Sequence, residues 1–322
     1  ESRKNAKNEA AEVDPPADMG EASSVENWHE EIDAMGWDRT PSEVELAHRL
    51  IEYLTPPGHP RPVSDEGTMW RYSQTDGVWV EVTAASVTRI VSGWDKCRTD
   101  DKKQLKISEK ASRAARAIAM HLVEGVGFFG RAPRGVMLKS QFLAVDVVKK
   151  TVTLEAPSPD HRARHKLSAD PSAPGGILTQ YIATAHDGTD AQEKIELMGQ
   201  VAFSALAGLG TVYKKAVLLY GEKGTGKSQF LRLVQGLVPQ AAQCTVLPQK
   251  MGEDYHCAAL ANKTLNIVGE LEADEFLKEG NVKSIMHGEP IQARQPRGEV
   301  FQLVPIALHL FCAMCLPAAP GV

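Results

Sequence analysis

Residues 221–228 read Gly-Glu-Lys-Gly-Thr-Gly-Lys-Ser, a spacing that is typical of a loop that binds phosphate groups. The three glycines allow the backbone to curl so that its N–H groups face phosphate oxygens. Lys227 could then reach the β- and γ-phosphates of a nucleoside triphosphate, and the Ser228 hydroxyl could be a ligand of Mg²⁺. We therefore expect ATP and Mg²⁺ as cofactors, with the nucleotide bound by Gly221, Glu222, Lys223, Gly224, Thr225, Gly226, Lys227 and Ser228.

A strand must end and a helix must begin at this loop for it to bind phosphate. Residues 216–220 are a bounded apolar run of strand length. Residues 229–235 have helical periodicity with Phe230 and Val234 on one side, and Gly236 is placed to end the helix. The alternative is a chance glycine-rich turn, which the strand and the helix on either side disfavour.

An acidic residue after a second predicted strand could help to hydrolyse the triphosphate. Residues 264–269 form this strand and Glu270 follows it, downstream of Lys227. A carboxylate in this position can orient the attacking water and help to hold Mg²⁺. We therefore expect Glu270 and Lys227 to be catalytic, with Glu270 also a metal ligand and Glu272 a second candidate carboxylate. Gly269 stands where many ATPases have another acidic residue, and the alternative is an ordinary acidic loop.

A predicted hairpin further downstream carries basic side chains. Residues 291–301 have apolar flanks around a turn at residues 296–298, which places Arg294 and Arg297 at or near the tip. Together with Lys283, these side chains could bind the phosphates of single-stranded DNA in a central pore. The position of the hairpin between two predicted strands favours this interpretation over a solvated turn.

The composition is that of an ordinary globular protein, and it argues against a protein that coats nucleic acid through bulk positive charge. Apolar residues make up 43% of the 322 residues and charged residues 24%, enough for two domains with their own cores. The formal net charge of −5 argues against bulk electrostatic binding but leaves room for a local basic channel. The apolar run at residues 304–317 is too short to span a bilayer and contains His309, so we expect a buried strand and no membrane segment.

The five cysteines are an odd number, widely spaced, and fit a reducing cytosol rather than a disulfide framework, so we expect a cytoplasmic protein. Cys312 and Cys315 form a C-x-x-C pair with His309 three residues before it. A structural metal site would need a second pair of ligands at suitable spacing, and the sequence has none. Buried cysteines in a strand, predicted at residues 306–313, are therefore the favoured interpretation.

The part of the chain before the loop has its own helical and hairpin patterns. Residues 41–54 predict an amphipathic helix with Thr40 as its N-cap, Pro41 at its first position and Glu43 completing a capping box. Residues 69–82 predict a β-hairpin. Its aromatic residues could stack on bases, but a place in the core is favoured for Trp70, Tyr72 and Trp79.

Two further helices and a basic connection complete this part. Residues 108–125 predict a long helix with basic residues along one side, which either contact nucleic acid or form a solvated face. Residues 192–209 predict another helix. Between them, residues 157–174 are rich in proline and basic residues and are expected to be a surface connection that crosses between domains.

The order of these elements resembles the superfamily 3 helicase module of phage, plasmid and poxvirus primase–helicases. The resemblance begins at about Pro41 and is strongest in residues 221–228, 260–270, 283–294 and 309–317. It implies an α/β fold, namely an AAA+-type P-loop NTPase core with a parallel sheet, preceded by a mainly helical domain with a small β-hairpin. It also implies an ATP-dependent DNA helicase or translocase motor that acts in DNA replication in a bacterial host.

The resemblance implies partners and a domain order as well. Single-stranded DNA would pass through a hexameric ring of copies of the chain, and an N-terminal primase domain would precede a fragment that opens with Glu1. Residues 1–25 would be a disordered linker, because their polar composition cannot form a core. Residues 26–195 would be the family-specific domain and residues 196–322 the helicase core, truncated at its C-terminus.

The chain departs from the family pattern at the end of this core. Met314 stands at the sensor position where the pattern has an asparagine, and a thioether cannot hold a water molecule as an amide does. The arginine finger of the family would lie beyond Val322. The alternative function is therefore a nucleotide- and DNA-binding module without efficient turnover. A small-molecule kinase is disfavoured, because no lid or substrate pocket follows the loop.

Overall fold

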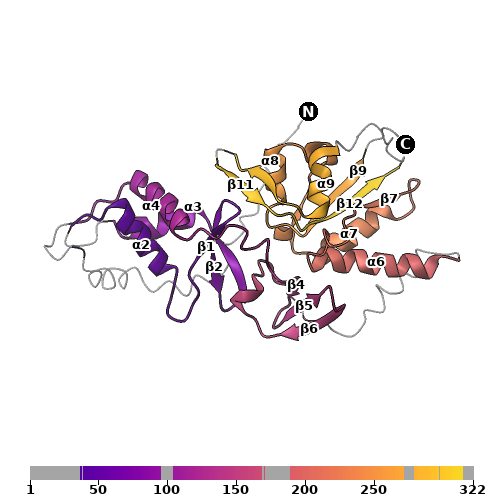
Figure 1. The fold of residues 1–322 in the computed structure, drawn as a ribbon, viewed down its shortest axis with the longest axis horizontal. Helices are drawn as coiled ribbons and strands as arrows, with labels where there is room; N and C mark the ends of the chain where they lie inside the picture. Colours follow the sequence, from indigo (N-terminus) through magenta and orange to yellow (C-terminus); the bar gives the residue numbers. More distant parts are fainter. Residues whose placement is uncertain are drawn as a thin grey trace, which may run out of the picture.

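The computed structural model describes residue 37 and residues 39–95, 104–168, 170, 189–271, 279–296 and 298–314. These residues form a mixed α/β structure in two parts that lie side by side in Figure 1, with α2 to β6 in one part and α6 to β12 in the other. The predicted domain boundary at residues 195 and 196 stays a prediction, and the predicted linker at residues 1–25 lies outside the described residues. No described helix is long and apolar enough to cross a lipid bilayer.

Both parts of the molecule contain helices. The bounds are α2 (Glu43–Tyr53), α3 (Ala84–Gly93), α4 (Glu109–Leu122), α6 (Ala191–Leu206), α7 (Lys227–Leu237), α8 (Asp254–Cys257) and α9 (Glu279–His287). Short 3-10 turns are η1 (Pro159–His161), η2 (Gln240–Ala242), η3 (Pro248–Lys250) and η4 (Ala258–Leu260).

The strands form antiparallel sheets upstream and a parallel sheet downstream. The upstream strands are β1 (Val63–Asp65), β2 (Thr68–Ser73), β3 (Val78–Val82), β4 (Gly135–Met137), β5 (Phe142–Asp146) and β6 (Thr151–Glu155). The downstream strands are β7 (Val217–Tyr220), β8 (Gln243–Cys244), β9 (Leu265–Leu271), β10 (Ile291–Arg294), β11 (Val300–Leu303) and β12 (Leu308–Ala313).

Helices α2, α3 and α4 form a small bundle at one end of the molecule (Figure 1). Their buried apolar faces meet around Leu50, Val91 and Ala119, together with Trp94, which ends α3. The apolar spacing of residues 41–54 and 108–125 predicted α2 and α4, and both predictions are confirmed to within a few residues.

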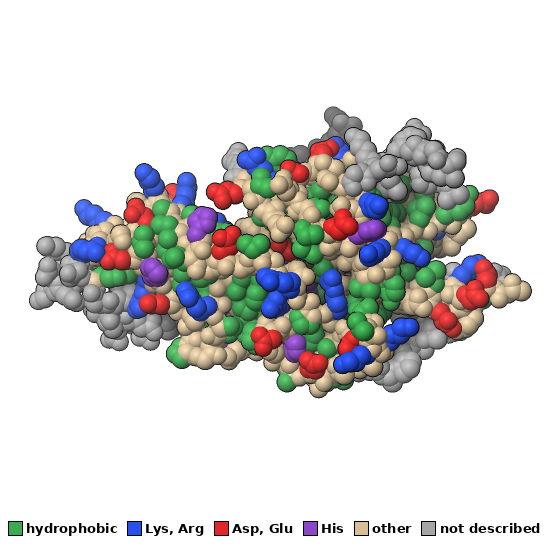
Figure 2. All heavy atoms as spheres, in the orientation of Figure 1, with side chains coloured by type: hydrophobic (Ala, Val, Ile, Leu, Met, Phe, Trp, Pro, Cys, Tyr) green, Lys and Arg blue, Asp and Glu red, His purple; other side chains and the backbone are tan. Residues whose placement is uncertain are grey.

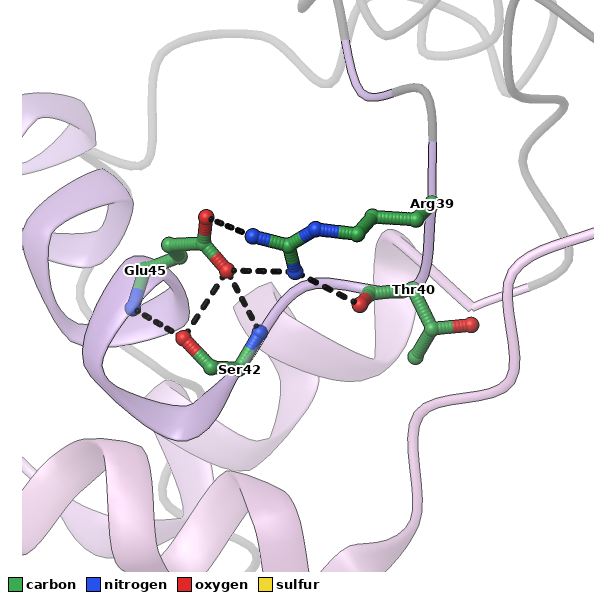
Figure 3. A network of polar contacts seen from close by, with 4 residues as sticks. All are labelled: Arg39, Thr40, Ser42 and Glu45. Atoms are coloured by element: carbon green, nitrogen blue, oxygen red, sulfur yellow. Dashed lines mark hydrogen bonds and ion pairs between the residues drawn. The ribbon is translucent and has the colours of Figure 1, made fainter.

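The cap of α2 differs from the predicted one. The N-cap is Ser42, not Thr40, because the Ser42 hydroxyl accepts from the backbone N–H of Glu45 while the Glu45 carboxylate accepts from that of Ser42 (Figure 3). Arg39 adds an ion pair to Glu45 at 2.7 Å. The backbone hydrogen bond from Ser42 and the Arg39 guanidinium hold the pKa of the Glu45 carboxyl at about 2.

The predicted aromatic hairpin is confirmed and its aromatic residues belong to the core. Strands β2 and β3 pair antiparallel, with Tyr72 opposite Trp79. Trp70, Tyr72, Trp79 and Phe129 are buried in one cluster, so they are not available to stack on bases. Four strands of this part, β1, β4, β5 and β6, were not predicted. Strands β1 and β4 have only three residues each, and β6 is exposed along its whole length. The upstream part thus holds two three-stranded sheets rather than one small hairpin among helices.

The basic segment after β6 was predicted to be a surface connection, and this is wrong for its central side chains, which are covered, although Pro157, Asp160 and Ser168 are exposed. The side chains of Arg164 and Glu66 form an ion pair and are only 7% and 5% exposed. His165 Nε2 donates to the carbonyl oxygen of Asn262 at 2.8 Å, and burial lowers the pKa of its imidazole to about 4. The segment does cross between the two parts of the molecule, because Asn262 lies immediately upstream of β9.

The downstream sheet is parallel and covered on both faces. Its strand order is β7-β12-β9-β8. Helices α6 and α7 cover one face through a cluster that includes Val201 and Phe230, while α8, α9 and the β10–β11 hairpin cover the other around Ile285. Alternate residues of β12 therefore enter opposite clusters, which explains why this strand is apolar throughout.

Helix α7 is longer at both ends than its sequence pattern predicted. It begins at Lys227 and continues to Leu237, so Gly236 lies inside it. A glycine ends a helix by adopting positive φ, and Gly236 is not among the residues with positive φ. The predicted buried side, with Phe230 and Val234, is confirmed.

Candidate functional site

The glycine loop joins the end of β7 at Tyr220 to the start of α7 at Lys227, as predicted. Gly224 and Gly226 have φ of 89° and 88°, values that residues with a side chain rarely adopt. A Cβ atom added at either position would meet no atom within 4 Å. The backbone conformation, and not lack of space, therefore requires glycine at these two positions.

The ammonium group of Lys227 lies inside this loop. Its Nζ donates to the carbonyl oxygens of Gly221 and Glu222, the latter at 2.7 Å, and lies 3.4 Å from Thr225 Oγ1. The Thr225 hydroxyl closes the loop by donating to the same Glu222 carbonyl at 2.9 Å. The Lys227 ammonium group is therefore placed so that the oxygens of a bound anion can replace the loop carbonyls as its hydrogen-bond acceptors.

The first turn of α7 is suited to an anion. Its N-cap is Gly226, so no side chain accepts from the first N–H groups, and the turn has no acidic residue. The Ser228 hydroxyl in this turn is exposed and makes no hydrogen bond with the described residues. A serine oxygen and a carboxylate are hard oxygen ligands of the kind that Mg²⁺ prefers.

Glu270 lies at the same edge of the sheet as the loop. Ala313 of β12 pairs with Tyr220 on one side and with Leu271 on the other, so the three strands end level. The register of β12 against β9 shifts between Phe311 and Ala313, and Glu270 is exposed at this irregularity.

The Cys312 thiol of β12 is affected by both predicted catalytic charges. Burial raises its pKa, while the charge of Lys227 lowers it and that of Glu270 raises it. The roles of Lys227 and Glu270 stay predictions, and Glu272 lies outside the described residues.

Met314 follows β12 at this edge and is 50% exposed. It comes directly after Ala313, the partner of Tyr220, so its backbone lies beside the start of the glycine loop. A thioether is only a weak acceptor, so Met314 offers neither a donor nor a strong acceptor there.

The predicted hairpin is confirmed, with Arg294 opposite Val300. The guanidinium of Arg294 is exposed, donates from Nε to the Gly298 carbonyl at 3.0 Å and lies 5.9 Å from the ring centroid of Tyr255. Lys283 is exposed on α9, and Arg297 lies outside the described residues. Tyr255 was not predicted as part of this site, since its exposure depends on how α8 packs against β10.

A groove of about 750 Å³ separates the hairpin tip from α4 and from the β1–β2 turn. A strand of DNA is not expected in this groove, because acidic side chains predominate along it. Over the face that is visible in Figure 2, basic and acidic side chains are interspersed. The charged residues that line the groove are Asp65, Glu66, Glu81, Glu124 and Glu299 against Arg116 and His121.

Cys312 of the C-x-x-C pattern and the nearby His309 are both buried. His309 is fully buried, burial lowers its pKa to about 4, and its Nδ1 accepts from the Asn266 amide at 3.1 Å. Cys312 is buried in the cluster on the α7 face. Over the described ranges there is no group of three or more side chains that could hold a metal ion, and Cys315 lies outside them. For Cys312, the prediction of a buried strand cysteine is confirmed.

Residues 219–318 match a protein family described as a family of unknown function, DUF5906. The chain is similar to solved apo structures of the C-terminal region of NrS-1. Three of them have TM-scores of 0.47, 0.45 and 0.43 at 12%, 12% and 10% identity, and the matches cover 84–86% of this chain. The chain spans 57–58% of the length of these structures. No curated protein matches the chain.

Proposed function

We propose that the chain is an ATP-dependent DNA helicase or translocase module that acts in replication, built on an AAA+-type P-loop NTPase core. The observation that carries the proposal is the meeting of the glycine loop, Glu270 and the end of β12 at the carboxyl edge of one parallel sheet. Ligands bind at this edge in open α/β sheets. The sequence resemblance to superfamily 3 helicases adds that the triphosphate would drive movement along DNA.

In this proposal the loop residues bind ATP and the neighbouring strands act on it. The N–H groups of the loop and of the first turn of α7 bind the phosphates, and Lys227 moves from the loop carbonyls to the γ-phosphate. Ser228 and Glu270 would hold Mg²⁺, which neutralises charge that develops on the phosphates. Glu270 orients the attacking water.

DNA contacts are assigned to Arg294 of the β10–β11 hairpin and to Lys283 of α9. Both side chains are exposed and neither lines the acidic groove. The bound strand would be single-stranded DNA, and copies of the chain would surround it as a hexameric ring. Arg297 belongs to the same proposal by its place in the sequence.

The test is ATP hydrolysis with and without single-stranded DNA. Glu270→Gln should bind ATP normally but lower the rate of hydrolysis by about 10²-fold or more, because the carboxylate no longer positions water. Lys227→Ala should lose ATP binding itself. Lys215→Ala and Glu193→Gln are matched controls on exposed residues outside the loop and should change neither property. Hydrolysis that survives both Lys227→Ala and Glu270→Gln would refute the proposal.

A second candidate is a module that binds nucleotide and DNA without efficient turnover, and Met314 favours it. An exposed thioether at the edge of the site cannot hold a water molecule as an amide would. If this is so, the chain binds ATP through Lys227 but hydrolyses it slowly, and Met314→Asn raises the rate. A rate unchanged by Met314→Asn argues against this candidate.

A further inference from the structure

A cavity of about 70 Å³ lies where the two parts of the molecule meet. Arg134 and the segment from His161 to His165 line it from the upstream part. The downstream wall includes Ala242, Thr264 and Ile306, which lie just before β8, β9 and β12. The cavity is therefore at the amino ends of the parallel strands. Since β9 has seven residues, the glycine loop at the opposite edge is about 20 Å away.

The lining of this cavity carries positive charge without a carboxylate. Three arginines and two histidines contribute to it, and no aspartate or glutamate does. Two of the arginines have partners: Arg162 donates to the Phe128 carbonyl at 2.7 Å, and Arg164 forms the buried ion pair with Glu66. Arg134 has no side-chain hydrogen bond or ion pair with any described residue, and burial lowers the pKa of its guanidinium.

Three polar atoms buried around the cavity also lack partners within the described part of the chain. They are His161 Nδ1, Thr264 Oγ1 and Asn262 Oδ1. His161 is only 9% exposed, and its Nε2 lies 3.0 Å from the Glu155 carboxylate. Buried polar atoms are nearly always hydrogen-bonded, so a bound species is expected to satisfy the His161 and Thr264 atoms, whereas Asn262 Oδ1 can only accept and needs a donor.

Water alone would leave the charge of the partly buried Arg134 without a counter-ion. An oxyanion would pair with it. The Thr264 hydroxyl can donate to such an anion, and a protonated His161 can donate from Nδ1 while Nε2 stays on Glu155. One water molecule needs about 10–15 Å³ of such a cavity, so there is room for a tetrahedral anion several times larger.

We propose that this cavity is a second anion site, which binds one phosphate group between the two parts of the molecule through Arg134, Thr264 and His161. The phosphate comes either from a nucleic acid backbone or from a free phosphate in solution. Because Arg134 and Thr264 belong to different parts, the bound phosphate would hold the parts together.

The experiment measures binding of inorganic phosphate by calorimetry in a chain that carries Lys227→Ala. This substitution removes the principal cation of the glycine loop, so remaining phosphate binding reports on the cavity and is independent of the nucleotide site. We expect one phosphate site to remain. Adding Arg134→Gln should weaken it at least about tenfold, because a charge-assisted hydrogen bond is lost. Arg89→Gln, at an exposed arginine of α3, is the matched control and should leave it unchanged.

Thr264→Val tests the site with a substitution that preserves side-chain shape. It should weaken phosphate binding while leaving the melting temperature without phosphate unchanged or higher, since it removes a buried hydroxyl that has no partner. In a competition arm, a short single-stranded DNA that displaces phosphate from the Lys227→Ala chain identifies the backbone as the source. Phosphate binding unaffected by the DNA identifies free phosphate. No phosphate binding in the Lys227→Ala chain, or equal binding with Arg134→Gln, overturns the proposal.

Discussion

Substitution of Arg164 by methionine tests the burial of the segment that joins the two parts of the molecule. The Arg164 and Glu66 side chains are 7% and 5% exposed, so removal of the guanidinium leaves a carboxylate that is buried without its partner. Such a loss costs about 3–5 kcal/mol of unfolding free energy. The guanidinium also lies 4.2 Å from the Phe129 ring centroid, and methionine retains much of this packing but not the charge.

A double substitution separates the ion pair from the packing. Replacing Glu66 by methionine as well removes the unpaired carboxylate. The chain with both Glu66→Met and Arg164→Met should therefore be more stable than the chain with Arg164→Met alone. The assay is urea unfolding followed by tryptophan fluorescence, because Trp70 lies 5.5 Å from the Arg164 guanidinium.

The matched control is Arg113→Met, which breaks an ion pair whose side chains are 74% and 67% exposed. Exposed helix pairs of this spacing contribute only about 0.3–0.5 kcal/mol. If Arg164→Met costs no more than this control, the Arg164–Glu66 ion pair is not buried and the segment lies at the surface.

Three further predictions follow from single features. Ser42→Ala should cost about 1 kcal/mol by removing the cap of α2, measured by urea unfolding, and a cost near zero would contradict the capping box in Figure 3. His309 is buried and neutral with a pKa of about 4, so the unfolded chain binds more protons between pH 4 and 6.5. Stability should therefore fall as the pH is lowered through this range, and the fall should be shallower for His309→Gln. Arg294→Ala should weaken binding of single-stranded DNA and reduce its salt dependence, as measured by fluorescence anisotropy, whereas the exposed control Arg89→Ala should not.

Short-range patterns predicted those elements whose signals lie within a few neighbouring residues. The spacing of Gly221, Gly224 and Gly226 between an apolar run and a helical pattern placed the loop correctly, because positive φ is a local requirement. The alternation in residues 69–82 likewise predicted the hairpin and the core position of its aromatic residues. Exact ends were less well predicted: Thr40 and Ser42 are both good N-caps, and only the reach of the Glu45 carboxylate selects Ser42.

The sequence by itself determined the loop, the strands around it and the side chains available for phosphate chemistry, since these depend on local backbone conformation and apolar spacing. Only the tertiary structure decided which side chains meet. The level ends of β7, β12 and β9 bring the start of the glycine loop and Glu270 to the same edge of the sheet, and strand order has no short-range signature. Burial of Arg134, His161 and Arg164 is also a tertiary property, because a run of basic residues and prolines looks the same in sequence whether solvent or protein surrounds it.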